Sequence, residues 1–264
     1  MLNINTIKIG FIGYGNMASA IAKGLIQSDA IQPDQLFATA RDYDKLCRST
    51  AELGIHPCKD TLELADLCDV LFIAVKPYQV EGVLAPLAGK LENKVIISVA
   101  AGIYHEDLAR ILPGSHHLAT VPNTPVSVCE GVFVCETEHS LSTEETAFVQ
   151  ELLEAISIVR FVDSDHMNIA STISGCGPAF AAMFIEALGD AGCKHGLTHE
   201  TAYALAAQML AGTGKMAVAS RSHPGQLKDA VCSPGGTTIV GVSTLEQHSF
   251  RYAVIDAIDQ IQKK

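Results

Sequence analysis

The sequence has no tryptophan, few aromatic residues and few basic ones, and these shortages exclude one class of function. Aromatic side chains make up 6% of its 264 residues, and 18 Lys and Arg stand against 29 Asp and Glu, for a formal net charge of −11. Nucleic-acid binding depends mainly on neutralising phosphates and stacking bases, so this chain is not expected to bind DNA or RNA. Its hydrophobic content of 48% excludes intrinsic disorder.

The eight cysteines are not arranged for metal binding or for disulfide exchange. No two of them stand in the Cys-x-x-Cys spacing that zinc ribbons and thioredoxin-type sites use. Most lie among Ala, Val and Leu, where a free cysteine behaves as a small buried hydrophobe. We therefore expect reduced thiols and a cytoplasmic location.

The chain is also expected to be soluble, with no membrane partner. Its first apolar stretch leads directly into a glycine turn, whereas a signal peptide ends in a small-residue cleavage site. Residues 167–185 are uncharged over a length that would span a membrane, but Ser174-Gly175-Cys176-Gly177-Pro178 interrupts them. This pattern predicts two helical pieces buried in protein.

Common catalytic signatures are missing. There is no Gly-x-Ser-x-Gly motif, and His195 and His199 lack the glutamate of a metalloprotease helix, so no metal site is expected. His116 and His117 lie beside a predicted strand, where a structural role is expected. A reaction whose chemistry is carried by a cofactor fits these absences.

Residues 1–162 alternate strand-like and helical patterns. The candidate strands are residues 7–12, 36–40, 70–75, 95–99, 117–121 and 158–162, and a helical stretch at 17–27 joins the first two. Several strands are continuous apolar runs, as expected when helices cover both faces of a parallel sheet. The pattern predicts a Rossmann-type domain, an α/β fold with a doubly wound, mostly parallel sheet.

Residues 163–264 contain only helical patterns and form the second predicted domain. Residues 199–220 are so rich in Ala, Leu and Met that the predicted helix is apolar almost all round, which is typical of a helix buried on every side. A segment of about 100 residues is too small to bury such a helix alone. We therefore expect an all-α domain that forms an obligate dimer.

A glycine motif follows the first predicted strand and opens the first predicted helix. Gly13, Gly15 and Ala18 match the Gly-x-Gly-x-x-Gly/Ala dinucleotide pattern. Gly13 permits the tight turn, Gly15 lets the backbone approach a pyrophosphate, and Ala18 permits close packing of helix on strand. The helix N-terminus then offers free N–H groups to the phosphates.

The end of the second predicted strand bears on the choice of nicotinamide cofactor. NAD-selective sites place a carboxylate there, whereas this chain has Arg41, whose guanidinium suits the 2′-phosphate of NADP(H). The alternative is a solvated loop arginine. Lys76, after a later strand, is either a phosphate or ribose contact or another solvated side chain. NADP(H) is the expected cofactor, with NAD(H) as a second option.

Two glycine clusters interrupt the helical half, at residues 174–178 and at residues 233–238. Each can be a simple turn between helices. Together, hydroxyl groups and backbone N–H groups at helix starts are also suited to binding a small carboxylate without a basic side chain.

The whole sequence resembles the pyrroline-5-carboxylate reductases. The segments that carry the resemblance are residues 9–18, 74–77, 98–103, 122–125 and 174–178, and above all the Leu-Lys-Asp-Ala-Val-Cys-Ser-Pro-Gly-Gly-Thr-Thr segment at 227–238. The resemblance implies hydride transfer from NAD(P)H to the imine carbon of 1-pyrroline-5-carboxylate, which yields L-proline in the last step of proline biosynthesis. It also implies a homodimer of interlocked C-terminal helices, often assembled further into a decamer.

Site residues follow from the same resemblance. Thr238 would act as the catalytic residue by hydrogen-bonding the ring nitrogen, the backbone of Gly236 and Thr237 would hold the carboxylate, and Val231, Ser233 and Gly235 would complete the substrate site. The cofactor site would comprise Gly13, Gly15, Asn16, Met17, Ala18, Arg41, Ala74, Val75, Lys76, Pro77, Ala100, Ala101 and Gly102. Many family members carry Arg where this chain has Ala119, a departure that bears on affinity or assembly.

Two other functions compete with this interpretation. The β-hydroxyacid dehydrogenases pair a similar N-terminal domain with a helical half, but they use a lysine on the helix after a glycine-rich segment. Residues 174–193 contain no lysine. A non-catalytic sensor that binds NADP(H) is the second rival, and the intact 233–238 segment argues against it.

Overall fold

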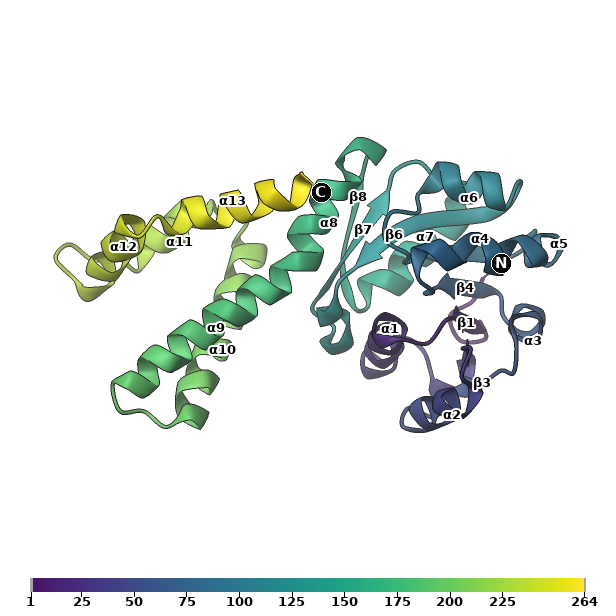
Figure 1. Cartoon of the computed structure of the whole chain (residues 1–264), viewed down its shortest axis with the longest axis horizontal. Coiled ribbons are helices and arrows are strands. Elements are labelled where there is room, and N and C mark those ends of the chain that lie inside the picture. The colour runs from purple at the N-terminus through teal and green to yellow at the C-terminus, as the bar shows by residue number, and fades with distance from the viewer. Residues whose placement is uncertain (1, 264) are drawn as a thin grey trace. The chain divides into compact units, whose positions relative to one another are not determined.

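The computed structural model describes residues 2–263, which form two compact units that divide after Gly175 (Figure 1). The boundary expected from the sequence, at residues 162–163, lies earlier, at the end of the last strand. The residues between the two positions stay with the first unit because helix α8 (Met167–Ser171) packs against strand β7 (Gly131–Glu136).

The first unit is built on one eight-stranded sheet in the order β3-β2-β1-β4-β5-β6-β7-β8. Its other strands are β1 (Ile9–Ile12), β2 (Leu36–Thr39), β3 (His56–Pro57), β4 (Val70–Ile73), β5 (Val95–Ser98), β6 (His116–Pro122) and β8 (Ser157–Val162). All neighbouring strands are parallel except β6 and β7, which are antiparallel. The doubly wound, mostly parallel sheet predicted from the sequence is confirmed.

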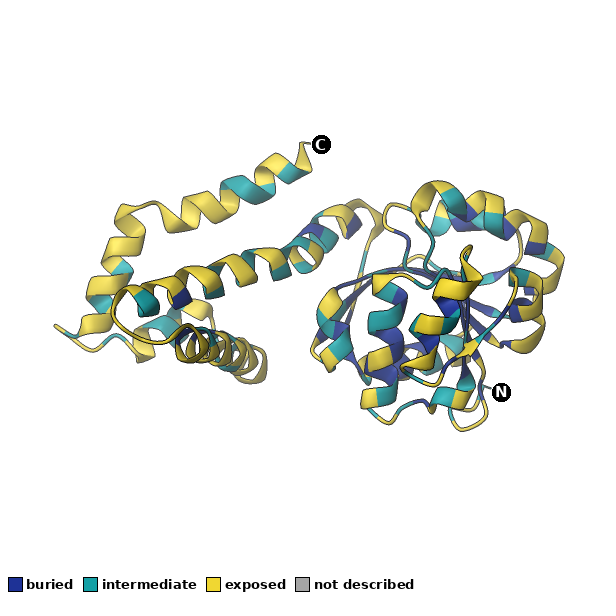
Figure 2. Ribbon diagram, turned by 60° about the horizontal axis from the view of Figure 1, so that its bottom comes forward, coloured by how far each residue is buried: buried dark blue, intermediate teal, exposed yellow. Residues whose placement is uncertain are grey.

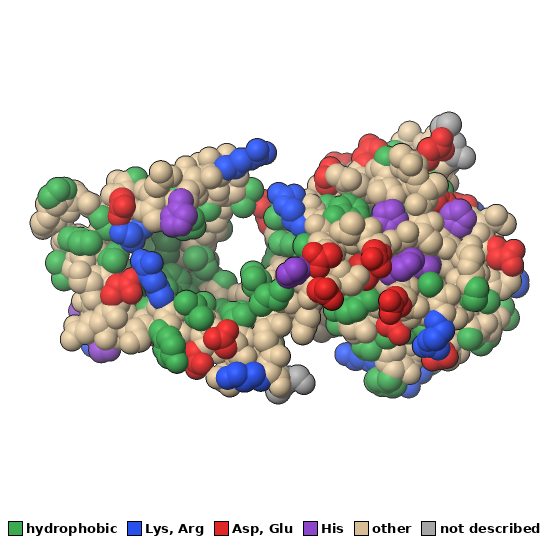
Figure 3. Space-filling model, turned by 90° about the horizontal axis from the view of Figure 1, so that it is seen from above, with side chains coloured by type: hydrophobic (Ala, Val, Ile, Leu, Met, Phe, Trp, Pro, Cys, Tyr) green, Lys and Arg blue, Asp and Glu red, His purple; other side chains and the backbone are tan. Residues whose placement is uncertain are grey.

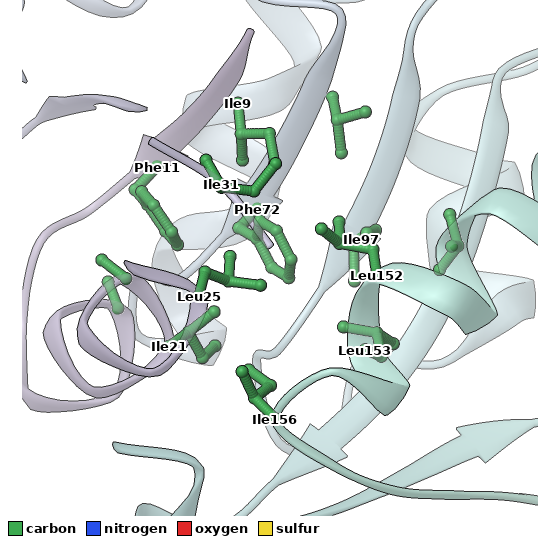
Figure 4. Packing of buried hydrophobic residues seen from close by; sticks show 14 of the residues in the cluster. Ile9, Phe11, Ile21, Leu25, Ile31, Phe72, Ile97, Leu152, Leu153 and Ile156 are labelled. Atoms are coloured by element: carbon green, nitrogen blue, oxygen red, sulfur yellow. The ribbon is translucent and has the colours of Figure 1, made fainter. Parts of the chain in front are cut away.

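Helices cover both faces of this sheet. Their bounds are α1 (Asn16–Gln27), α2 (Tyr43–Ala51), α3 (Thr61–Leu67), α4 (Val80–Leu84), α5 (Ala88–Leu91), α6 (His105–Ile111) and α7 (Thr143–Glu154), with 3₁₀ turns at Pro33–Gln35, Pro77–Gln79, Ala85–Leu87, Thr124–Val128 (η4) and Ser164–His166. Because successive strand residues point to opposite faces, Phe11 and Phe72 pack under α1, α2 and α7 (Figure 4). Ile12 and Ile73 pack on the other face, under α3 to α6.

All six strands predicted from the sequence are present, with ends that differ by up to two residues, but two further strands were not predicted. β3 is a two-residue edge strand, too short for an apolar run. β7 follows β6 with only the 3₁₀ turn η4 between them, because residues 123–130 are too few for the crossover that a parallel pair needs. β7 therefore pairs antiparallel with β6, and the pattern of alternating strands and helices does not reveal it.

The second unit is entirely helical within the described residues. Its elements are α9 (Gly177–Lys194), α10 (His199–Ser220), α11 (Pro224–Ala230), α12 (Thr237–Gln247) and α13 (Phe250–Gln262). The sequence predicts two separate helical pieces on either side of residues 174–178, and this prediction is wrong. A π turn at Thr172–Cys176 continues α8 into α9, so the two predicted pieces form one helical run, Ser164–Lys194. Within residues 2–263, this run alone is long and apolar enough to cross a membrane by length and composition.

The second unit buries few of its own side chains. Among its described residues, Gly189, Ala202 and Ala206 alone are buried. Its helices are accordingly coloured almost throughout as exposed or intermediate in Figure 2. Large apolar side chains on α10 and α13 are exposed in the single chain, among them Leu205 and Met216, both at 60%. Figure 3 shows apolar side chains in several patches on the surface of this unit. Such an exposed apolar area needs a partner surface.

All eight cysteines are free thiols, as predicted. Cys58, Cys68 and Cys135 are fully buried, and the other five are half-buried. Burial raises the pKa of Cys58 to about 11 and that of Cys68 and Cys135 to about 12, so these three thiols stay protonated and unreactive near neutral pH.

Candidate active site

Four predicted cofactor segments meet at the carboxyl edge of the sheet. Backbone hydrogen bonds join the strand ends: the Gly13 N–H donates to the Thr39 carbonyl (3.0 Å), the Ala74 N–H to Ile12 (2.9 Å) and the Val99 N–H to Ile73 (3.0 Å). The loops that follow β1, β2, β4 and β5 therefore start side by side. Ligands of open α/β sheets bind at this edge.

The turn between β1 and α1 has the backbone that a pyrophosphate requires. Gly13 has φ +90°, and a Cβ atom there would lie 2.8 Å from the Ala74 carbonyl oxygen, so no other residue fits. A Cβ atom on Gly15 would meet nothing within 4 Å, which leaves the turn open on its outer side. Ala18 is fully buried, whereas Asn16 and Met17 form the more accessible first turn of α1.

The other predicted cofactor residues lie on the neighbouring loops. Arg41 and Lys76 are exposed, and Asp42 is engaged as the N-cap of α2, where its carboxylate accepts the Lys45 N–H at 2.9 Å. Arg41 itself lies just after the end of β2. Ala74, Val75 and Pro77 follow β4, and Ala100, Ala101 and Gly102 form a turn after β5 in which Gly102 has φ +77°.

The predicted substrate segment forms one tight turn in the second unit. Val231 ends α11, Gly235 takes a left-handed conformation (φ +68°), and the Gly236 N–H donates to the Ser233 carbonyl at 3.0 Å. A Cβ atom on Gly236 would lie 2.5 Å from the Ser233 Oγ and 3.1 Å from the Ser233 carbonyl oxygen, so a larger residue there would require the Ser233 side chain to rotate away. Thr237 and Thr238 then form the first turn of α12.

The N-termini of α1 and α12 share a feature that suits anions. Both helices begin at an extended glycine, Gly15 or Gly236, and neither receives a hydrogen bond from a capping side chain. By contrast α2, α3, α7 and α10 are capped by the side chains of Asp or Ser or Thr residues. The free N–H groups of α1 and α12 are thus available to a phosphate and to a carboxylate.

One buried carboxylate was not predicted from the sequence. Glu136 is 1% exposed, and it accepts the His105 N–H at 2.6 Å and the Ser164 hydroxyl at 2.6 Å. It thereby ties the first residue of α6, just after the Ala100–Gly102 turn, to the end of the sheet. A single glutamate at the end of an apolar strand gives no signal of this role.

His117, whose ring contacts the same His105, is a buried side chain held by hydrogen bonds, in keeping with the structural role expected from the sequence. The residue is 2% exposed, and its ring lies with Nε2 at 2.9 Å from His105 Nδ1 and with Nδ1 at 2.9 Å from the Ser115 and Ser140 hydroxyls. Burial, and then the charge of His105, lower the pKa of His117 from 6.5 to about 4. The folded protein therefore holds this ring neutral.

Acid is expected to destabilise the first unit through His117. The unfolded chain binds the proton near pH 6.5 and the folded chain only near pH 4, so stability is complete above 6.5 and falls as the pH drops through this window. The loss between pH 7.5 and 5 should be about 2 kcal/mol, measured by urea unfolding. His117→Asn should lose less over the same interval; equal losses in variant and parent would contradict this role.

Fold and site together define the class: a nicotinamide-dinucleotide oxidoreductase with a Rossmann-type domain and a helical dimerisation domain. Residues 8–102 match the family model described as NADP oxidoreductase, coenzyme F420-dependent, and residues 164–264 match the one described as pyrroline-5-carboxylate reductase dimerisation. The pyrroline-5-carboxylate reductase of Treponema pallidum (strain Nichols) is 43% identical over 257 residues, which cover 96% of this chain and 97% of the relative. The chain belongs to the pyrroline-5-carboxylate reductase family.

Further relatives agree over the whole length. The enzyme of the same name from Escherichia coli (strain K12) is 37% identical, covering 97% of this chain and 96% of the relative. The crystal structure of Plasmodium falciparum pyrroline carboxylate reductase with NADP bound superposes with a TM-score of 0.86 at 33% identity, covering 98% of this chain and 97% of that one. Family membership removes the β-hydroxyacid dehydrogenase alternative.

Ala119, where many family members carry Arg, is fully buried in the apolar cluster beneath α6.

Proposed function

We propose that this chain reduces 1-pyrroline-5-carboxylate to L-proline with NADPH as the preferred hydride donor and NAD(H) as an alternative. The observation that carries the proposal is its likeness to pyrroline-5-carboxylate reductases over nearly its whole length, at 43% identity to one of them. The reaction is the last step of proline biosynthesis. The expected compartment is the cytoplasm, in keeping with the free thiols.

The carboxyl edge of the sheet fits a dinucleotide. The open turn at Gly15 and the uncapped start of α1 would receive the pyrophosphate. Arg41 would pair with the 2′-phosphate, and the loops carrying Lys76 and Ala100–Gly102 would border the rest of the molecule. When bound there, NADPH supplies the hydride that reduces the imine carbon.

The turn at residues 231–238 would hold the substrate. The backbone of Gly236 and Thr237 would hold the carboxylate. The Thr237 N–H would be the donor, because the Gly236 N–H already donates to the Ser233 carbonyl and the N-terminus of α12 carries no capping side chain. The Thr238 hydroxyl would hydrogen-bond the ring nitrogen, which carries the proton that ends up on the amine. Val231 and Ser233 would flank the ring, and Gly235 sets the turn.

The proposed substrate site offers hydroxyl and backbone groups rather than a strong acid, and this suits the reduction of a cyclic imine. A cyclic imine is basic enough to be protonated without a strong acid, and the resulting iminium already accepts hydride. The protein then contributes position: it fixes the carboxylate, presents one face of the ring to the donor and limits water. No strong general acid is needed in such a site.

We further propose a homodimer as the basic unit, with assembly to a decamer as the next level. The second unit matches a dimerisation model, and of its described residues Gly189, Ala202 and Ala206 alone are buried. Helices with so little internal burial are stabilised by packing against a second copy.

The deciding experiment follows the loss of NADPH absorbance on addition of 1-pyrroline-5-carboxylate. NADH in place of NADPH and a reaction without imine serve as the comparisons. Rapid oxidation that depends on the imine supports the reductase. Tight NADPH binding without oxidation would instead favour an NADP(H)-binding sensor or a different imine.

Arg41→Asp should reverse the cofactor preference. The aspartate would repel the 2′-phosphate of NADPH but accept a hydrogen bond from the 2′-hydroxyl of NADH. We expect the KM for NADPH to rise about 50-fold and the KM for NADH to change less than about threefold. Steady-state kinetics with both donors measures this, with Lys45→Asp as the matched control on the adjacent helix α2. Equal effects of Arg41→Asp on the two donors would remove this role from Arg41.

A further inference from the structure

We infer that Asn123 is a positioning residue: its side-chain amide gives the Ser174 carbonyl the hydrogen bond that Pro178 cannot give. The two residues are 51 positions apart in the chain, and both lie in the first unit. Asn123 belongs to the Pro-Asn-Thr-Pro segment at 122–125, which has no role in the proposed cofactor or substrate contacts.

Both ends of the Asn123 amide are used. The side-chain Nδ2 donates to the Ser174 carbonyl at 3.0 Å, and the side-chain oxygen accepts the Val132 N–H at 2.9 Å. The residue is 7% exposed, and its own N–H donates to the Val132 carbonyl at 3.2 Å. The two partners fix the orientation of the amide, because a carbonyl only accepts and an N–H only donates.

The need for this donor arises in the helical run Ser164–Lys194. In an α-helix the carbonyl of Ser174 would accept from the N–H four residues later, but residue 178 is proline and has none. The run adjusts by forming the π turn Thr172–Cys176, and the Ser174 hydroxyl bonds back to the Ala170 carbonyl at 2.9 Å. Asn123 supplies the missing donor from outside the helix.

The same residue begins a segment that packs on the cofactor helix. Asn123 is the N-cap of η4, and its carbonyl accepts the Val126 N–H at 3.3 Å. The Val126 carbonyl in turn lies against Gly24 of α1, at a place where a Cβ atom would approach within 2.1 Å. Asn123 thus connects the π turn to the element that supports α1, and it holds that turn at a defined place on the end of β6 and β7.

The first experiment measures local order and does not depend on the proposed function. Asn123→Asp has the same shape and keeps the acceptor for Val132, but it places an oxygen against the Ser174 carbonyl. We expect amide hydrogen exchange in residues 172–180 to accelerate about tenfold, while Asn168→Asp, at an exposed position on α8, leaves it unchanged. Unchanged exchange in Asn123→Asp would overturn the inference.

A double-mutant cycle tests the link to Pro178. Pro178→Ala provides an N–H that can donate to the Ser174 carbonyl, so the Asn123 donor becomes less necessary. Asn123→Asp should then accelerate exchange less than about threefold relative to Pro178→Ala alone. Additive effects would show that Asn123 acts independently of the proline and would overturn this part of the inference.

The kinetic consequence rests on the proposed function. The π turn contains the start of the Ser174–Pro178 cluster, one of the two glycine clusters whose sequence is suited to binding a carboxylate. Asn123→Asp should therefore raise the KM for 1-pyrroline-5-carboxylate about fivefold. The Kd of NADPH should change less than about twofold. An unchanged imine KM with accelerated exchange would leave Asn123 a structural role only, and an equal rise in the NADPH Kd would mean general loosening. A wild-type chain that does not reduce the imine would instead contradict the proposed function and leave the exchange results standing.

Discussion

Gly24→Ala is expected to destabilise the first unit by about 3 kcal/mol or more. Gly24 lies within α1, where an added Cβ atom would meet the Val126 carbonyl oxygen at 2.1 Å, the Val126 carbonyl carbon at 3.1 Å and Ile156 Cγ2 at 3.2 Å. The first two atoms belong to the backbone of η4 and cannot move aside by rotating a side chain. Either α1 or η4 must shift, and α1 is the helix that begins at the dinucleotide turn.

The expected change in the free energy of unfolding is opposite in sign to that of an ordinary Gly→Ala substitution inside a helix. Alanine in place of glycine inside a helix normally stabilises by about 1 kcal/mol, because it restricts the unfolded chain. Gly82 in α4 provides the matched control, since a Cβ atom there would meet nothing within 4 Å. Urea unfolding should show Gly82→Ala as equally or more stable and Gly24→Ala as much less stable. A Gly24→Ala variant as stable as the parent would mean that α1 and η4 are not held this closely.

A tenfold or greater loss of NADPH affinity should accompany that loss of stability, measured on the folded fraction. The helix start at Gly15 and the close approach at Gly24 belong to the same rigid element, so displacing one end moves the other. The glycines of the first unit therefore serve two purposes. Gly13 and Gly15 shape the ligand turn, and Gly24 seats the helix that carries it.

The sheet was predictable from sequence wherever burial on both faces produces a continuous apolar run. β1, β4 and β5 are buried at every position, and their strands appear as such runs in the sequence. β7 was missed although Gly131–Glu136 is largely apolar, because its position in the sheet follows from the short segment at residues 123–130 and not from its composition. The length of the connection between β6 and β7 indicates an antiparallel pair, whereas the apolar pattern of β7 does not.

The candidate site divides in a similar way. The dinucleotide turn could be predicted because its requirements are local: positive φ at Gly13 and no side chain at Gly15. The hydrogen bonds from His105 to Glu136 and from Asn123 to Ser174 join residues 31 and 51 positions apart. No local pattern specifies such pairs, since each partner alone resembles an ordinary polar residue beside a strand or a helix. They become visible only when the sheet brings them together.

Thr238→Ala is expected to lower turnover about 100-fold while leaving NADPH binding within about twofold of the parent. In the proposed site the Thr238 hydroxyl is the side-chain group that bonds the ring nitrogen, whereas the carboxylate is held by backbone N–H groups that the substitution keeps. The ring would then bind without a fixed orientation, so the loss should appear in kcat more than in the KM of the imine. Stopped-flow oxidation of NADPH separates the two.

Thr238→Ser is the matched variant for this test, because it keeps the hydroxyl and removes one methyl group from the first turn of α12. It should retain most of the turnover, provided that the hydroxyl and not the shape of the side chain carries the effect. Parent-like turnover in Thr238→Ala would show that backbone N–H groups and ring packing suffice to orient the imine. Loss of NADPH binding in the same variant would place Thr238 in the dinucleotide site instead. Since α12 begins at an uncapped glycine, its N–H groups remain to hold a carboxylate in every one of these variants, so binding and orientation of the substrate can be measured separately.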